Sequence, residues 1–145
     1  MSDNSQISFD LDTSSATNGI GIDVWLNNQN VFSTRYLETR QHVTFDVADQ
    51  DGDHELRIVI LGKTAEHTEV DDHGYITKDV VIHIENFVIG GLEVNQLFQE
   101  KAKYIHNFNG TGNEIQDKFY GSAGCNGTIS FEFTTPIYLW LLENL

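Results

Sequence analysis

Strict alternation of apolar and polar residues is the feature that most constrains the fold of this chain. Residues 6–12 read QISFDLD, residues 20–26 read IGIDVWL and residues 128–134 read TISFEFT. Successive side chains of a β-strand point to opposite faces of its sheet, so this period of two predicts strands with one buried and one exposed face. In the last segment Ile129, Phe131 and Phe133 are expected to point inward, and Pro136 to end the strand.

The stretch DVADQDGDHELRI, residues 46–58, is predicted to contain a β-hairpin turn at Asp51-Gly52. Asp-Gly is a favoured pair for a two-residue turn because both turn positions need φ > 0, so a valine at Gly52 is expected to destabilise the turn. In this register Val47 faces Leu56, and the apolar residues of both strands share one face. An EF-hand calcium loop starting at Asp49 is disfavoured, because its sixth residue is not glycine and its twelfth is not glutamate.

The remaining segments complete an all-β pattern. The apolar phase changes within residues 79–89, DVVIHIENFVI, which predicts a β-bulge near Glu85-Asn86. Residues 94–104 are the one candidate helix, and residues 137–145, IYLWLLENL, are expected to close a sheet edge as a last strand. The alternative for this tail is an apolar surface that a neighbour covers. We expect a single-domain antiparallel β-sandwich of jelly-roll type over residues 1–145, with at most one short helix.

The charge balance limits the classes of partner. The chain has 22 acidic residues against 8 Lys and Arg, a net charge of −14. Nucleic acids and anionic membranes attract basic surfaces, so neither is an expected partner. The single Cys125 cannot form an internal disulfide, and the first residues lack the basic and apolar regions of a signal peptide. We therefore expect a protein that is not secreted by a signal peptide.

No sequence motif names a catalytic reaction. The chain has no G-x-S-x-G motif, and Cys125 stands in GCNG without an identifiable base beside it. The many carboxylates satisfy the two-carboxylate condition of a glycosidase too easily to count as evidence. We therefore expect a non-catalytic protein.

The acidic loop of residues 62–78 contains the candidate metal ligands Glu66, Asp71 and Asp72. Calcium prefers oxygen ligands, and this loop is rich in carboxylates. The loop also has two histidines, but it lacks the CxxC or HExxH spacing of zinc sites. The alternative is a solvated acidic loop that binds no metal.

Five aromatic residues are candidates for stacking on sugar rings: Trp25, Tyr75, Phe119, Tyr120 and Trp140. Of these we expect Trp25, Tyr75 and Tyr120 to bind a ligand. Trp25 is out of phase with the apolar residues Ile22 and Val24, so it is expected to point away from the main core. The alternative is that these rings are part of a core, as most strand aromatics are.

Residues 20–94 resemble calcium-dependent xylan-binding carbohydrate-binding modules. The resemblance lies in DVWLNNQNVFSTRYLETRQHVTFDVADQDGDHELRIVILGKT, the acidic loop that follows, and KDVVIHIENFVIGGLEV. It implies a small jelly-roll domain that holds calcium and sugar at loops on one end of the sandwich. The loop with Glu66, Asp71 and Asp72 would be the matching place.

The whole chain, including HNFNGTGNEIQDKFYGSAGCNGTISFEFTTPIYLWLLENL, also resembles small uncharacterised proteins of T4-like marine phages that infect cyanobacteria. This resemblance implies a non-catalytic structural or accessory protein of the capsid or tail. Its partners would be other virion proteins or further copies of itself, and its location the virion or the cytoplasm of the infected bacterial host. The alternative function is that of a carbohydrate-binding module, with a glycan as partner and calcium as an optional cofactor.

Overall fold

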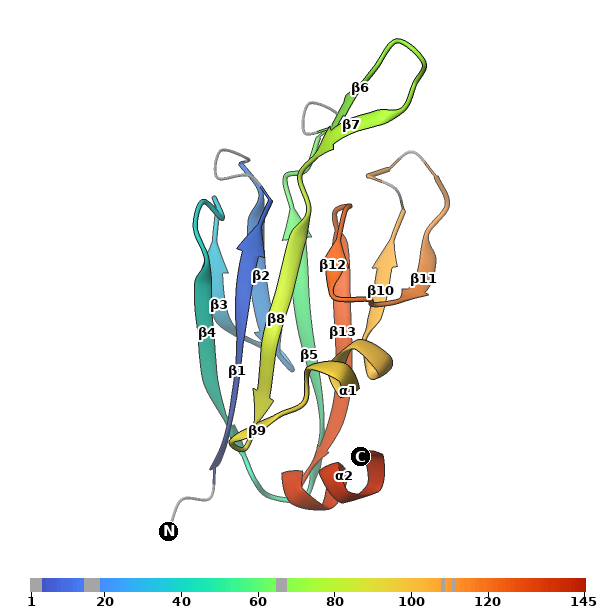
Figure 1. Ribbon diagram of the computed structural model, residues 1–145. Helices are drawn as coiled ribbons and strands as arrows, with labels where there is room; N and C mark the ends of the chain where they lie inside the picture. The colour runs from blue at the N-terminus through green and yellow to red at the C-terminus, as the bar shows by residue number, and fades with distance from the viewer. Residues whose placement is uncertain (1–3, 15–18, 65–67, 108, 111) are drawn as a thin grey trace.

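The computed structural model describes residues 4–14, 19–64, 68–107, 109–110 and 112–145, and it shows a β-sandwich with two short helices (Figure 1). The first sheet has the strand order β12-β8-β1-β4, and β9 also pairs with β8. All of its neighbouring strands are antiparallel. Its strands are β1 (Asn4–Thr13), β4 (Gln41–Ala48), β8 (Ile82–Ile89), β9 (Leu92–Glu93) and β12 (Ser122–Ala123).

The second sheet has the order β11-β10-β13-β5-β2-β3 and is also antiparallel, which confirms the predicted fold class. Its strands are β2 (Gly21–Leu26), β3 (Gln29–Thr34), β5 (Gly52–Leu61), β10 (Lys103–His106), β11 (Ile115–Lys118) and β13 (Gly127–Thr135). A hairpin of β6 (Thr68–Val70) and β7 (Ile76–Asp79) projects beyond one end of the sandwich (Figure 1). Helix α1 (Asn95–Lys101) confirms the predicted short helix, and helix α2 (Ile137–Asn144) lies at the end opposite the hairpin. No helix among the described residues has the length and apolar character needed to cross a membrane.

The core between the two sheets is filled by the alternating apolar residues of the predicted strands. The inward residues Ile129, Phe131 and Phe133 of β13 are at most 2% exposed, as predicted. The ring of Phe131 lies 5.5 Å from that of Phe87 on β8, 5.2 Å from that of Phe98 on α1 and 5.6 Å from that of Trp140 on α2. These ring contacts join the two sheets and both helices into one apolar cluster.

The predicted hairpin at Asp51-Gly52 is wrong. Strand β4 pairs with β1 in the first sheet, whereas β5 pairs with β2 and β13 in the second, so the chain crosses between the layers here. Val47 lies opposite Ser5, and it does not face Leu56. Val47 and Leu56 are nevertheless both buried as predicted, because strands in opposite sheets of a sandwich turn alternate residues to the shared core, as a hairpin with one covered face does.

The crossing changes the expected effect of replacing Gly52. Gly52 does not have a positive φ, and an added Cβ would meet its nearest atom, His54 Nε2, at 3.7 Å. Gly62 has φ +85°, and an added Cβ would lie 2.9 Å from the carbonyl oxygen of Gly19. In urea unfolding, Gly52→Val should change the free energy of unfolding by about 0.5 kcal/mol or less, and Gly62→Val should lower it by about 2 kcal/mol. Equal losses in the two variants would contradict this assignment.

The predicted β-bulge is confirmed between β1 and β8. Asp10 pairs with Glu85 and Ser8 pairs with Val88, so the register shifts at this point. Asn86 has φ 55°, and its Nδ2 donates a hydrogen bond of 2.9 Å to Asp10 Oδ2. The bulge thus turns the Asn86 side chain onto the outer face of the first sheet.

The end of the chain forms helix α2 rather than the expected last strand, so the structure has two helices where at most one was expected. Pro136 separates the helix from β13. Ile137, Trp140 and Leu141 are buried at helical spacing, and the leucines of this segment are good helix formers. The exposed residues of this segment are also largely apolar: Tyr138, Leu139 and Leu142 on the helix and Leu145 after it, beside the exposed Glu143.

A buried ion pair fastens the sandwich end from which the β6–β7 hairpin projects. Lys63 is 6% exposed, and its Nζ lies 2.7 Å from Asp79 Oδ1 and also donates to the carbonyl of Gly124. Thr68 Oγ1 donates to the same Asp79 oxygen at 2.7 Å. Burial by itself raises the pKa of Asp79, but the hydrogen bonds from Lys63 and Thr68 outweigh it and hold the pKa below its ordinary value.

Candidate functional site

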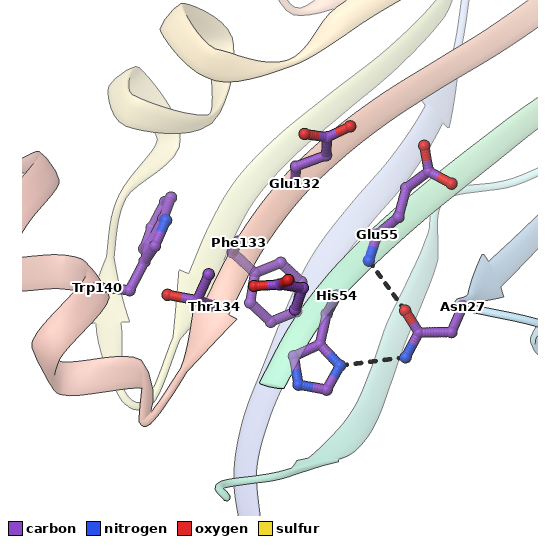
Figure 2. Close-up of a pocket in the computed structure, with 8 residues that line it drawn as sticks. Asn27, His54, Glu55, Glu132, Phe133, Thr134 and Trp140 are labelled. Atoms are coloured by element: carbon purple, nitrogen blue, oxygen red, sulfur yellow. Dashed lines mark hydrogen bonds between the residues drawn. The ribbon is translucent and has the colours of Figure 1, made fainter. Parts of the chain in front are cut away.

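An open groove of about 720 Å³ lies at the α2 end of the second sheet (Figure 2). It is formed by β5, β13, the turn after β2, and α2. Its polar lining residues are Asn27, Asp53, Glu55, Glu132 and Thr134, and rings of His54, Phe133 and Trp140 complete it. The groove therefore combines hydrogen-bonding groups with apolar surface, as small-molecule sites do.

The strand register brings four polar side chains together on the outer face of the sheet. Glu132 lies opposite Glu55, and Thr134 lies opposite Asp53, in the pairing of β13 with β5. These positions alternate with core residues in both strands, so the side chains point away from the core. Two strands that are far apart in sequence thus form one polar surface.

His54 fixes the base of the groove through both ring nitrogens. Asn27 Nδ2 donates to His54 Nδ1 at 3.1 Å, and His54 Nε2 lies 2.9 Å from Thr135 Oγ1 (Figure 2 shows the first of these bonds). Because an amide nitrogen only donates, the ring hydrogen is assigned to Nε2. Asn27 Oδ1 accepts the backbone N–H of Glu55 at 3.0 Å, so both ends of the Asn27 amide are held in place.

Three carboxylates share the groove, and two of them have no ionic partner among the described residues. Glu55 accepts a hydrogen bond of 2.8 Å from Ser130 Oγ, and Arg57 Nε lies 3.5 Å from Glu55 Oε1 without hydrogen-bond geometry. In the part of the chain that the structure describes, no hydrogen bond or ion pair holds the carboxylate of Asp53 or Glu132. Like charges directly opposite each other on a sheet are destabilising, so Glu132 beside Glu55 is costly for the fold.

The carboxylates on the outer face of the first sheet have a different environment. The guanidinium of Arg40 lies 3.1 Å from Asp10 Oδ2, 3.0 Å from Asp12 Oδ2 and 3.4 Å from Glu85 Oε1. Hydrogen bonds to Asp10, of which that from Asn86 contributes most, lower its pKa to about 2. Arg40 therefore pairs with these three acidic groups, whereas the groove leaves acceptor oxygens open to a ligand.

The three predicted ligand-binding aromatics lie on different elements. Trp25 is half-buried on the outer side of β2, as its phase predicted, and the guanidinium carbon of Arg57 is 6.0 Å from its ring centroid. Arg57 also contacts Glu55, so Trp25 adjoins the groove. Tyr75 is exposed between β6 and β7 on the projecting hairpin, and Tyr120 is exposed between β11 and β12. A binding role for these residues stays a prediction.

The predicted metal ligands are described in part. Glu66 lies outside the described residues. Asp71 Oδ1 accepts the backbone N–H groups of His73 at 2.9 Å and Tyr75 at 3.0 Å, so it stabilises the turn of the β6–β7 hairpin. Asp72 is exposed, and the described ranges contain no cluster of three or more His, Cys, Asp or Glu side chains that could hold a metal ion. Calcium binding at this loop stays a prediction.

Most of the groove residues were not candidates in the sequence analysis. The alternation of TISFEFT places Glu132 on the outer face, and that signal was available. Asp53 and His54 were assigned to the hairpin, which would have placed β5 beside β4 instead of β13. Asn27 lies in a polar turn, and nothing local in the sequence indicates that it contacts His54.

The sequence matches no protein-family model and no curated protein. Two solved structures are similar in fold. The first is vCBM60 in complex with galactobiose, with TM-score 0.52 and 13% identity over 87% of this chain and 96% of that one. The second is a selenomethionine form of vCBM60, described with two families of calcium-dependent carbohydrate-binding modules, with TM-score 0.49 and 15% identity over 88% and 89% of the two chains. At 13% identity the likeness to the first structure shows a shared β-sandwich fold.

Proposed function

We propose that this protein binds a carbohydrate in the groove of Asp53, Glu55 and Glu132. The observation that carries the proposal is the pair of carboxylates, Asp53 and Glu132, that lack ionic partners among the described residues and face an open groove. The fold shared with vCBM60, which was solved with galactobiose, supports the same class of ligand. This function is the alternative from the sequence analysis rather than its leading expectation.

The chemistry of the groove suits sugar hydroxyl groups. A hydroxyl that donates to an ionised carboxylate forms a short hydrogen bond, roughly twice as strong as one between neutral groups. Thr134 adds a hydroxyl that both donates and accepts. The rings of Phe133 and Trp140 lie at the base of the groove but are only 2% and 7% exposed, so the polar groups supply most of the contact with a sugar. The Asn27 amide is already hydrogen-bonded, so its role is to position His54 and the Glu55 backbone.

The test is calorimetric titration of the wild type, Glu132→Gln and Glu38→Gln with galactobiose and xylobiose. Glutamine keeps the size of Glu132 and removes its charge, so we expect about tenfold weaker binding or more, the usual effect of losing one charged hydrogen bond. Glu38 is exposed in the segment before β4 and does not line this groove. Glu38→Gln should therefore bind like the wild type. Failure of both sugars to bind, or equal affinities of the two variants, would reject the proposal.

The same titrations with calcium and then with a chelator test the predicted calcium site. If Asp71 and Asp72 hold calcium that assists binding, the chelator weakens the affinity, and Asp72→Asn makes binding insensitive to it. If the chelator has no effect on wild-type binding, the groove works without calcium and Asp71 serves only the hairpin turn.

A second candidate function is self-association, as expected of a virion component. It is favoured by the exposed apolar side of α2, where Leu139 is 58% and Leu142 78% exposed. Contiguous exposed apolar surface commonly marks a contact site between proteins. Sedimentation velocity should then show oligomers of the wild type that Leu142→Glu dissociates. A monomeric wild type at high concentration would reject this role.

A further inference from the structure

A second groove, of about 530 Å³, lies on the same sheet at the end away from α2. Glycines form its floor. A Cβ on Gly21 would lie 3.2 Å from the carbonyl oxygen of Thr34, and a Cβ on Gly62 would lie 2.9 Å from that of Gly19. Backbone packing at this floor therefore excludes side chains, and bare peptide groups are left at the base of the groove.

The walls of this second groove carry the groups that a sugar ring contacts. Tyr36 is 63% exposed and Leu61 is 47% exposed, and both line the groove. The Tyr36 ring lies next to Gly19, with its Cε1 4.0 Å from the position of an added Cβ. Asp23 and Arg35 add an acceptor and a donor beside these apolar groups. An open aromatic ring with polar neighbours suits a ligand that has one apolar face and many hydroxyls.

The two grooves are connected along the outer face of β2. Gly21 and Asp23 line the second groove, and Asn27, just after the strand, lines the first. Trp25 lies between them on the same side of β2, because alternate residues of a strand share a face. A strand rises about 3.3 Å per residue, so Gly21 and Asn27 are about 20 Å apart.

Strand β5 pairs with β2 and likewise extends from one groove to the other. Leu61, opposite Gly21, lines the second groove, and Glu55 lines the first. Between them Arg57 lies opposite Trp25, and its Nη2 donates to the Asn27 carbonyl at 3.1 Å. The strip between the grooves therefore has a fixed guanidinium next to an indole ring.

We infer that the two grooves and the strip between them form one binding track for an extended polysaccharide chain. The inference rests on the proposed carbohydrate binding and adds the class of ligand, which is the interior of a polymer and not a single sugar. Glu132 and Asp53 hold one stretch of the chain, Arg57 and Trp25 contact the middle, and Tyr36 stacks on a ring at the far end. This track crosses the outer face of the second sheet and needs no residue of the β6–β7 hairpin.

The test is a length series of galacto-oligosaccharides and xylo-oligosaccharides, from the disaccharides to the hexasaccharides, titrated into wild type, Tyr36→Ala and Tyr138→Ala. Tyr138 is the matched control, because it is 58% exposed on α2 and lines neither groove. Wild-type affinity should rise about tenfold or more with length, and Tyr36→Ala should lose that gain for the hexasaccharide while binding the disaccharide normally. Tyr138→Ala should match the wild type at every length.

The outcomes separate the two proposals. Absence of binding at every length overturns both the track and the proposed function. Disaccharide binding that Glu132→Gln weakens, with no gain from length and no effect of Tyr36→Ala, overturns the track and leaves the first groove as the complete site. A loss with Tyr36→Ala that is equal for short and long ligands also overturns the track, because it would place the short ligand in the second groove.

Discussion

The Lys63→Met variant is expected to unfold about 3 kcal/mol more easily than the wild type, because it removes one partner of a buried ion pair. Lys63 Nζ lies 2.7 Å from Asp79 Oδ1, and the side chains of Lys63 and Asp79 are only 3% and 27% exposed. Methionine fills a similar volume, so the loss comes from the uncompensated carboxylate and not from a cavity. Urea unfolding at neutral pH measures it, with Lys101→Met on the exposed side of α1 as the control.

The pH dependence of stability provides an independent check on this pair. The folded-state pKa of Asp79 is below its ordinary value, so the pair stabilises the protein fully above that ordinary value and loses its effect as the pH falls through the folded pKa. The wild type should therefore lose stability on acidification below about pH 4 more steeply than Lys63→Met. Parallel stability curves for the two proteins would show that the ion pair does not contribute.

The Phe131→Ala variant is expected to lose about 4 kcal/mol of unfolding free energy, the usual cost of deleting a buried ring. Phe131 is fully buried, and its ring is in contact with Phe87, Phe98 and Trp140 on three other elements. Phe131→Leu keeps much of the apolar volume and should cost about 1.5 kcal/mol or less. Guanidinium unfolding of both variants, followed by circular dichroism, gives the two values.

Removal of the Phe131 ring should also change the fluorescence of a neighbouring tryptophan. Trp140 packs edge-on against Phe131, with ring centroids 5.6 Å apart, so its fluorescence should change in the folded Phe131→Ala protein. Tyr120→Ala removes an aromatic ring that is 76% exposed and should cost about 0.5 kcal/mol or less. If the two alanine variants lose similar free energies, Phe131 is not a central contact of the core.

The strands and the buried residues could be predicted from sequence because burial follows the period of two. The pairing of strands could not. Val47 and Leu56 are buried whether β4 and β5 form a hairpin or belong to opposite sheets, so the pattern does not distinguish the two arrangements. The β-bulge was predictable because the apolar positions change phase at Glu85-Asn86 within one continuous segment of sequence.

The tail and the groove escaped prediction for different reasons. Residues 137–145 are almost uniformly apolar, and a run this short does not separate the period of a helix from that of a strand. The groove combines Asn27, His54 and Glu132 from three distant parts of the chain. Their meeting depends on the registers of β13 and of β2 with β5, which local patterns do not contain.

The central place of β13 in the second sheet has a consequence for synthesis. The ribosome makes β2, β3, β5, β10 and β11 before β13, yet both β5 and β10 pair with β13. Until it emerges, β5 presents an unpaired edge, and the aromatic cluster lacks the ring at its centre. The nascent chain therefore completes neither its apolar interior nor the carboxylate pair of Glu55 and Glu132 until translation has passed residue 135.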